Sequence, residues 1–89
     1  MASYVLVRAR VRNFEAWKQA YDAHLSVRQE YGLGEEHLLR GADDPYDLVL
    51  LFKASSLDRA KAFMSNPAVG EAMQKSGVVG KPDVTFLNS

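Results

Sequence analysis

Hydrophobic and polar residues follow two different periods at the start of the chain. Over residues 4–11 every second side chain is apolar, and this period of two predicts a strand whose apolar face is made by Val5, Val7, Ala9 and Val11. From residue 14 the large apolar side chains recur three or four positions apart, which predicts a helix over residues 14–31 with a buried stripe at Phe14, Trp17, Tyr21 and Leu25. Asn13 suits the N-cap of this helix, and Gly32 suits its C-terminal end.

Two more strand patterns follow, and a turn joins them. Residues 36–41 predict a short strand whose charged side chains suit the edge of a sheet. The turn falls at residues 43–46, where aspartates and a proline cluster. Residues 48–52 are apolar at both odd and even positions, which is typical of a strand that is covered on both faces.

The pattern then returns to helix and strand. Ser56 suits the N-cap of a second helix, which Asn66 and Pro67 interrupt and restart, because proline is favoured at the first position of a helix. Residues 77–82 predict a flexible connector that leads into a last strand over residues 84–87.

This order is a strand-helix-strand unit laid down twice, which is the signature of the ferredoxin-like split βαβ. We therefore expect an α+β fold with a four-stranded antiparallel sheet, both helices on one face, and a single domain over residues 1–89. The other face of such a sheet is bare, yet residues 48–52 predict that it is covered. A core of this size is also thin. A homodimer that packs the two bare faces together satisfies both conditions.

Charge and composition exclude several classes of partner. Eleven basic and eleven acidic residues cancel, so we expect no basic surface for nucleic acid or for an anionic membrane. The chain has no cysteine and therefore no disulfide or thiolate metal site. No apolar run approaches membrane-spanning length, and the first strand pattern follows without a signal segment, so a cytoplasmic location is expected.

Few residues point directly to chemistry. No glycine-rich phosphate loop or Ser-His-Asp set stands out, and two histidines on different elements, His24 and His37, do not predict a metal site. Trp17 and Tyr21 lie one turn apart on the predicted helix, either as core residues or as pocket residues with one polar atom each. His24 and Arg28 continue this flank. Such a set either holds an anionic or phenolic ligand or forms a solvated helix rim, and we favour the solvated rim.

Arg8 and Arg10 occupy unusual positions for charged residues. They lie on the face of the first strand that is expected to be covered, and a buried guanidinium requires a carboxylate or several acceptors. We expect them at the rim of a dimer contact, with pairing to acidic residues of the partner as the alternative.

Three segments of the chain carry a family resemblance. They are Val11-Arg12-Asn13-Phe14-Glu15-Ala16-Trp17-Lys18-Gln19-Ala20-Tyr21-Asp22, the pair Asp44-Pro45, and the pattern Ala60…Phe63…Asn66-Pro67…Ala72-Met73…Gly77-Val78-Val79-Gly80-Lys81-Pro82. Together they resemble small bacterial members of the dimeric α/β-barrel superfamily, which includes antibiotic-biosynthesis-monooxygenase-like proteins, stress-responsive barrel proteins and certain polyketide cyclases. The resemblance implies two protomers with their sheets face to face and their helices outside.

The resemblance also implies a small apolar cavity between the helices and the sheet of each protomer. Carried over by position, its ligand-binding residues are Val5, Val7, Ala9, Trp17, Tyr21, Phe63, Asn66 and Val69. Plant-type polyketide cyclases carry a tyrosine and a histidine at the positions of Phe63 and Val69, so a cyclase that works by that pair is not expected here. Monooxygenase relatives need no metal or flavin and let an activated aromatic substrate react with oxygen beside Trp, Tyr and Asn side chains, here Trp17, Tyr21 and Asn66.

Two functions therefore stand as expectations. The first is a cofactor-independent, monooxygenase-like enzyme that acts on a small aromatic or polyketide-like molecule, with Tyr21 and His24 as the catalytic, proton-handling residues. The second is a non-catalytic homodimer that binds such a molecule or has a structural role only. Neither function requires a metal, a cofactor, a nucleic acid or a membrane, and the sequence leaves the choice between them open.

Overall fold

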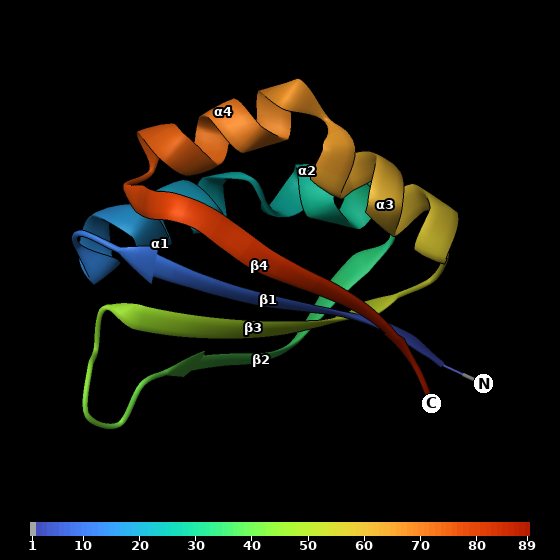
Figure 1. The fold of residues 1–89 in the computed structure, drawn as a ribbon. Helices are drawn as coiled ribbons and strands as arrows, with labels where there is room; N and C mark the ends of the chain where they lie inside the picture. The colour runs from blue at the N-terminus through green and yellow to red at the C-terminus, as the bar shows by residue number, and fades with distance from the viewer. Residues whose placement is uncertain (1) are drawn as a thin grey trace.

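Four strands form one antiparallel sheet, and all of the helices pack on the same face of it (Figure 1). The computed structural model describes residues 2–89. Along the chain the elements are β1 (Ser3–Val11), α1 (Phe14–Ala23), α2 (Leu25–Glu30), β2 (Leu33–Arg40), β3 (Asp47–Ala54), α3 (Leu57–Ser65), α4 (Pro67–Lys75) and β4 (Val78–Asn88). The strand order in the sheet is β2-β3-β1-β4, with every neighbouring pair antiparallel. This confirms the predicted α+β, ferredoxin-like split βαβ.

The helices begin where the sequence places their caps. Asn13 Oδ1 accepts a hydrogen bond from the backbone N–H of Ala16 at 3.0 Å, which satisfies one of the free donors at the start of α1. Ser56 has the same role for α3. Asn66 caps α4, and Pro67 occupies the first turn of that helix.

The helix predicted over residues 14–31 is divided into α1 and α2 at His24. The backbone of His24 has φ −98° and ψ 14°, which lie outside the α-helical range, and its N–H bonds to the carbonyl oxygen of Tyr21 at 3.2 Å. The guanidinium of Arg28 donates to the same oxygen at 2.6 Å. The last turn of α1 is therefore held closed by a side chain from α2.

All four strands extend beyond their predicted bounds, and β2 and β4 extend the most. β2 begins at Leu33 rather than at residue 36, and the predicted connector over residues 77–82 belongs almost entirely to β4. In β4 the added residues follow a register shift in the β1–β4 pairing between Arg8 and Arg10, after which pairing resumes. Gly80, at φ +72°, adopts the left-handed conformation that such an irregularity favours.

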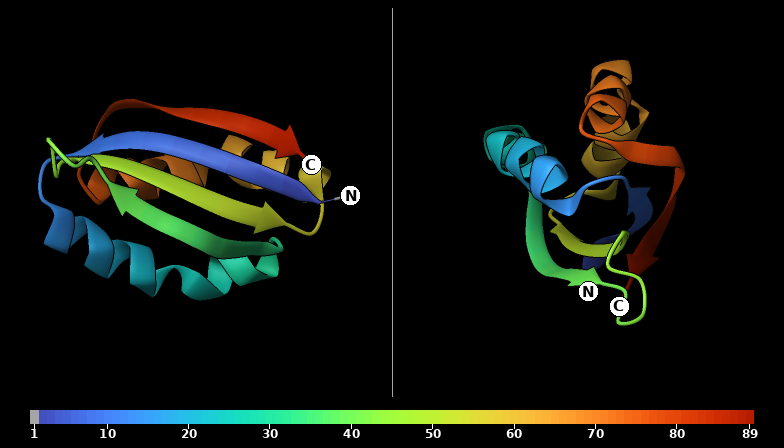
Figure 2. Two further views of the ribbon diagram at one scale, coloured as in Figure 1. Left: turned by 90° about the horizontal axis from the view of Figure 1, so that it is seen from below. Right: turned by 90° about the vertical axis from the view of Figure 1, so that its left-hand side faces the viewer.

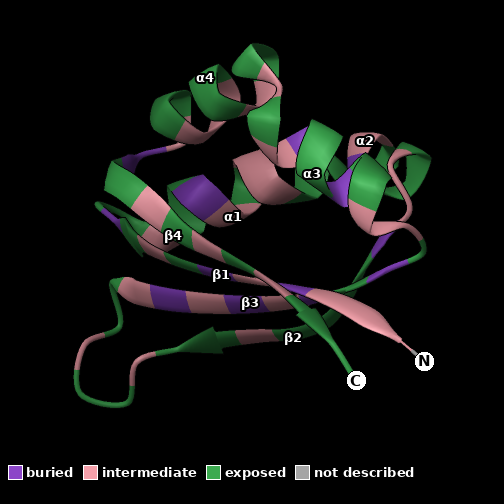
Figure 3. Ribbon diagram, turned by 45° about the vertical axis from the view of Figure 1, so that its right-hand side comes forward, coloured by how far each residue is buried: buried purple, intermediate pink, exposed green. Residues whose placement is uncertain are grey.

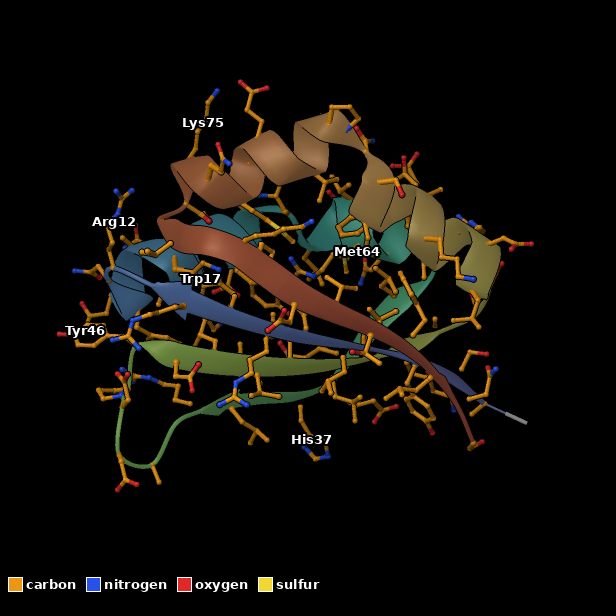
Figure 4. The ribbon with its side chains drawn as sticks, viewed as in Figure 1. Arg12, Trp17, His37, Tyr46, Met64 and Lys75 are labelled. Atoms are coloured by element: carbon orange, nitrogen blue, oxygen red, sulfur yellow. The ribbon has the colours of Figure 1, made fainter. Side chains whose placement is uncertain are left out.

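The core lies between the sheet and the helices (Figure 3). Its buried apolar side chains come from every strand, from α1 and from α3: Val5, Val7, Val11, Trp17, Leu33, Leu48, Leu50, Phe52, Ala54, Ala60, Phe63 and Val78. Figure 4 shows Trp17 and Met64 in this layer. Among the described residues, none of the helices combines the length and the apolar character needed to cross a membrane.

No helix within residues 2–89 covers the opposite face of the sheet, which is turned toward the viewer in the left-hand view of Figure 2. Strand register places on this face a group of apolar side chains that are exposed or half-buried: Tyr4, Leu6, Leu39, Val49, Leu51 and Leu87. We call these six residues the open-face cluster. Its centre lies on β1 and β3, the two inner strands.

Arg8 and Arg10 lie on this face as predicted, but they pair with acidic residues of their own chain. Arg8 Nη2 lies 3.0 Å from Asp47 Oδ2, and Arg10 bonds to Asp44 in the turn between β2 and β3. The hydrogen bond from Arg10, together with the backbone N–H of Tyr46, holds the pKa of the Asp44 carboxyl below its ordinary value. These exposed pairs satisfy the guanidiniums within the chain, so neither arginine requires a partner's carboxylate.

Candidate functional site

A cavity of about 360 Å³ lies between the helices and the sheet. Its walls are mostly apolar and come from α1, α2, α3 and α4 and from β1, β3 and β4. The predicted residues that the structure brings to this wall are Val7, Ala9, Trp17, Tyr21, His24, Phe63, Asn66 and Val69. Val5 is not among them, because it is fully buried between the cross-strand neighbours Phe52 and Phe86, away from the cavity.

Aromatic side chains form one continuous side of the cavity. The rings of Trp17 and Tyr21 stack at a centroid distance of 4.8 Å with 21° between their planes, and Phe52 lies 6.4 Å beyond Tyr21. Trp17 is only 5% exposed, so its position is fixed by packing against the sheet. A rigid aromatic surface of this kind suits a flat ligand.

The hydroxyl of Tyr21 is hydrogen-bonded to a carboxylate. It donates to Glu35 Oε1 on β2 at 2.7 Å. Burial raises the pKa of this hydroxyl well above its ordinary value of 10.0, and the hydrogen bond to Glu35 raises it further, while the charge of Arg28 opposes both. Tyr21 therefore stays protonated at neutral pH and acts as a hydrogen-bond donor rather than as a base.

His24 lies at the rim of the cavity, where α1 ends and α2 begins. Its side chain is exposed, and Nδ1 lies 2.8 Å from the carbonyl oxygen of Ala20. A carbonyl can only accept, so this contact assigns the proton of the neutral ring to Nδ1 and leaves the lone pair on Nε2. The neutral imidazole can therefore accept a proton at Nε2, and the residue lines the cavity.

Arg28 is the buried charge of this site, contrary to the favoured expectation that it lies on a solvated helix rim. The residue is only 6% exposed and lines the cavity. Its guanidinium carbon stands 3.6 Å from the centroid of the Tyr21 ring, which is a cation–π contact. Sequence spacing placed Arg28 one turn after His24, but it could not show that the break between α1 and α2 turns this side chain inward.

Asn66 and Tyr31 meet on the other side of the cavity. The amide of Asn66 donates weakly to the Tyr31 hydroxyl at 3.4 Å, while its Oδ1 caps α4. The Tyr31 ring packs edge-on against Phe63 at 5.3 Å. Both polar ends of Asn66 are therefore engaged in holding the helices. Tyr31 was not among the predicted site residues, because its place at the end of a helical pattern gives no sign of the cavity.

Nothing in the described part of the chain resembles a metal centre. No group of three or more His, Cys, Asp or Glu side chains within residues 2–89 is arranged to hold an ion. His37, the second histidine, points away from the helices, on the far side of the sheet from the cavity (Figure 4).

Comparison with known proteins gives a match in structure but not in sequence. No family model matches the sequence, and no curated protein sequence matches it. A candidate antibiotic biosynthesis monooxygenase from Bordetella bronchiseptica has a similar structure, with a TM-score of 0.78 at 13% identity over 99% of this chain and 96% of that one. A similar candidate from Nitrosomonas europaea gives 0.73 at 18% identity over 99% and 89% of the two chains.

A third similar structure has a stated activity. SnoaB, a cofactor-independent oxygenase from Streptomyces nogalater, gives a TM-score of 0.76 at 12% identity and covers 99% of this chain and 92% of its own. The likeness extends over nearly the whole of each chain, so it confirms the resemblance at the level of the fold. This chain has the fold of the antibiotic-biosynthesis-monooxygenase-like proteins.

Proposed function

We propose that the protein is a homodimeric, cofactor-independent oxygenase whose substrate is a small phenolic aromatic compound. The observation that carries the proposal is the cavity of about 360 Å³, which has an aromatic wall and an oriented imidazole at its rim. A space of this size admits a compound of two or three fused rings. The likeness of the fold to SnoaB supports oxygen chemistry without a cofactor.

The chemistry of the wall selects the ligand. A flat ring gains from stacking beside Trp17 and Tyr21, and the mostly apolar surroundings disfavour highly polar molecules. A nucleotide or sugar phosphate requires several cations or a glycine-rich loop for its phosphates, and the described residues that line the cavity include a single arginine and no lysine.

His24 is the residue that moves the proton in this scheme. Nε2 accepts the phenolic proton, and the resulting phenolate, which is far more electron-rich than the phenol, forms a carbon–oxygen bond with O₂ at a ring carbon. The imidazolium of His24 returns its proton to the peroxide, and the hydroperoxide formed then loses water as the ring carbon becomes a carbonyl. Phenol and O₂ thus give a quinone and water, and O₂ is the only oxidant. Tyr21 stays protonated throughout and holds the aromatic wall in place.

The experiment compares binding with turnover. Oxygen uptake and quinone absorbance are measured with 1-naphthol and related phenols, and binding is measured separately by calorimetry. We expect His24→Gln to lower kcat by about 100-fold or more, the usual contribution of a positioned acid or base, with little change in binding. His37→Gln is the matched control, because that histidine lies on the far side of the sheet.

The outcomes separate the two functions. Binding of phenols without oxygen uptake would identify a non-catalytic binding protein, and the absence of binding by any aromatic compound would contradict the proposal altogether. Turnover that survives His24→Gln unchanged would exclude the imidazole as the base.

The homodimer is proposed from the open-face cluster. Two copies packed face to face through these residues bury the apolar side chains that no helix covers, and we expect a contact of roughly 2,000 Å² or more in total. Sedimentation tests this directly. Leu51→Glu places a charge at the centre of the cluster and should give monomers, whereas Lys75→Glu on the outer surface of α4 should not. A wild-type protein that is a stable monomer at micromolar concentration would overturn the dimer.

A further inference from the structure

We infer that the cavity recognises an aromatic acid. The guanidinium of Arg28 lies buried against the Tyr21 ring, and some of its N–H groups have no acceptor among residues 2–89. The substrate would carry a carboxylate on its ring system, and Arg28 would bind that carboxylate. This inference rests on the proposed function, because it names the class of substrate for the same cavity.

The burial of Arg28 is the first step. A charged group taken out of water is costly unless charges or hydrogen bonds compensate for the lost hydration. The residue is 6% exposed, yet no Asp or Glu oxygen within residues 2–89 lies within ion-pair distance of it. The other buried residues of the described chain are apolar or glycine, so this cation stands alone in the interior.

The use of its hydrogen-bond donors is the second step. A guanidinium presents five N–H groups on three nitrogens. Nη1 donates to the carbonyl oxygen of Tyr21 at 2.6 Å, and no other acceptor in residues 2–89 receives a bond from Arg28. The structure contains no fully buried polar side-chain atom without a partner among those residues. Nε and Nη2 therefore keep a small accessible surface, and Arg28 is a residue of the cavity wall.

A purely structural role accounts for only part of this arrangement. The bond from Nη1 holds the end of α1, and the Tyr21 ring covers one face of the guanidinium plane. Neither contact uses the edge of the plane that carries the remaining N–H groups. A carboxylate matches that edge, since arginine and carboxylate groups form paired, parallel hydrogen bonds.

The neighbouring acids do not fill this role. Glu35 accepts the hydroxyl of Tyr21 at 2.7 Å, and Glu30, which lines the cavity, has an exposed side chain and makes no ion pair with Arg28. The ring of a bound aromatic acid would extend from Arg28 along the stacked Trp17 and Tyr21 side chains. Charge recognition at one end and ring stacking along the wall would then fix its orientation.

The test uses two probes of the same shape. 2-Naphthoate and 2-naphthamide differ in charge but not in their ring system, and calorimetry at neutral pH gives the affinity of each. We expect naphthoate to bind the wild-type protein about tenfold or more tightly than naphthamide, as is usual for a charged hydrogen-bonded pair. Arg28→Met should remove this preference and leave naphthamide binding nearly unchanged.

Controls separate this inference from the proposed function. Arg12→Met removes an exposed arginine outside the cavity and should keep the preference (Figure 4). Arg28→Gln, which retains an N–H donor for the Tyr21 carbonyl, replaces Arg28→Met if that variant does not fold. Equal binding of both probes by the wild type, or a preference that survives loss of Arg28, would overturn the aromatic acid and leave the cavity as a binding site. Failure of both probes to bind, while 1-naphthol binds, would overturn the inference alone, and failure of 1-naphthol as well would overturn the proposed function.

Discussion

Trp17→Ala is the perturbation whose effect the structure predicts most directly. A buried tryptophan removes about 150 to 250 Å² from water. At about 25 cal/mol per Å², this is worth about 4 to 6 kcal/mol as an upper estimate. Trp17 is 5% exposed, so nearly all of that area counts, and its stacking with Tyr21 at 4.8 Å is lost as well. We expect the free energy of unfolding to fall by about 3 to 5 kcal/mol, the usual range for such truncations.

That loss is large for a chain of this length. A domain of 89 residues is stable by about 4 to 13 kcal/mol, so the variant should lie close to the limit of folding. Trp17→Phe is the matched control, because it retains an aromatic ring beside Tyr21 and should cost much less. A failure of both variants would indicate a loss that is not specific to the ring.

Chemical denaturation followed by circular dichroism measures the change. Fluorescence is unsuitable, since Trp17 is the only tryptophan in the chain. All variants are compared at one protein concentration, because the proposed dimer would link stability to concentration. A loss below about 1 kcal/mol would refute the reasoning, because that value is too small for a large core aromatic.

Three further predictions concern single residues. The pKa of Tyr21 is higher in the folded protein than its ordinary value of 10.0, so this contribution to stability is fully present below pH 10.0 and is lost as the pH rises above that value. Stability measured as a function of pH should fall on the alkaline side, and Tyr21→Phe should remove this fall. Gly32→Ala forces a left-handed residue at φ +76° and a Cβ that would overlap Ser55 Oγ, so thermal unfolding should report a loss of about 1 to 2 kcal/mol or more. Asn13→Ala removes the cap on Ala16 N–H and should cost about 1 kcal/mol in chemical denaturation, and no loss would show that the cap is unimportant.

Local signals in the sequence predicted the frame of the fold because each acts over a few residues. The caps at Asn13, Ser56 and Asn66 and the glycine at residue 32 lie where the helices begin and end. The connector over residues 77–82 was predicted wrongly, since its two glycines and proline suggested flexibility. Pairing with β1 overrides that local preference.

Side-chain direction was harder to predict than the elements. The run over residues 48–52 is apolar at every position, so no alternation shows which side chains face the helices; strand register assigns Leu50 to the core, and Val49 and Leu51 to the open face. The prediction of a solvated rim for Arg28 was wrong, because the burial of this side chain depends on a break in the helix at His24. No helix-breaking residue marks that position in the sequence.

The position of β1 has a consequence for how the chain is made. β1 is an inner strand, yet both of its neighbours, β3 and β4, follow it in the sequence, and Ser3 finally pairs with Asn88. During synthesis β1 therefore emerges with both edges unpaired until β3 and β4 have been made. A strand with unpaired edges is most prone to pair with another molecule. Arg8 and Arg10 interrupt its apolar run, and charges within such a strand oppose aggregation. The same arginines that form surface ion pairs in the folded protein thus protect the nascent chain before their partners, Asp47 and Asp44, have been translated.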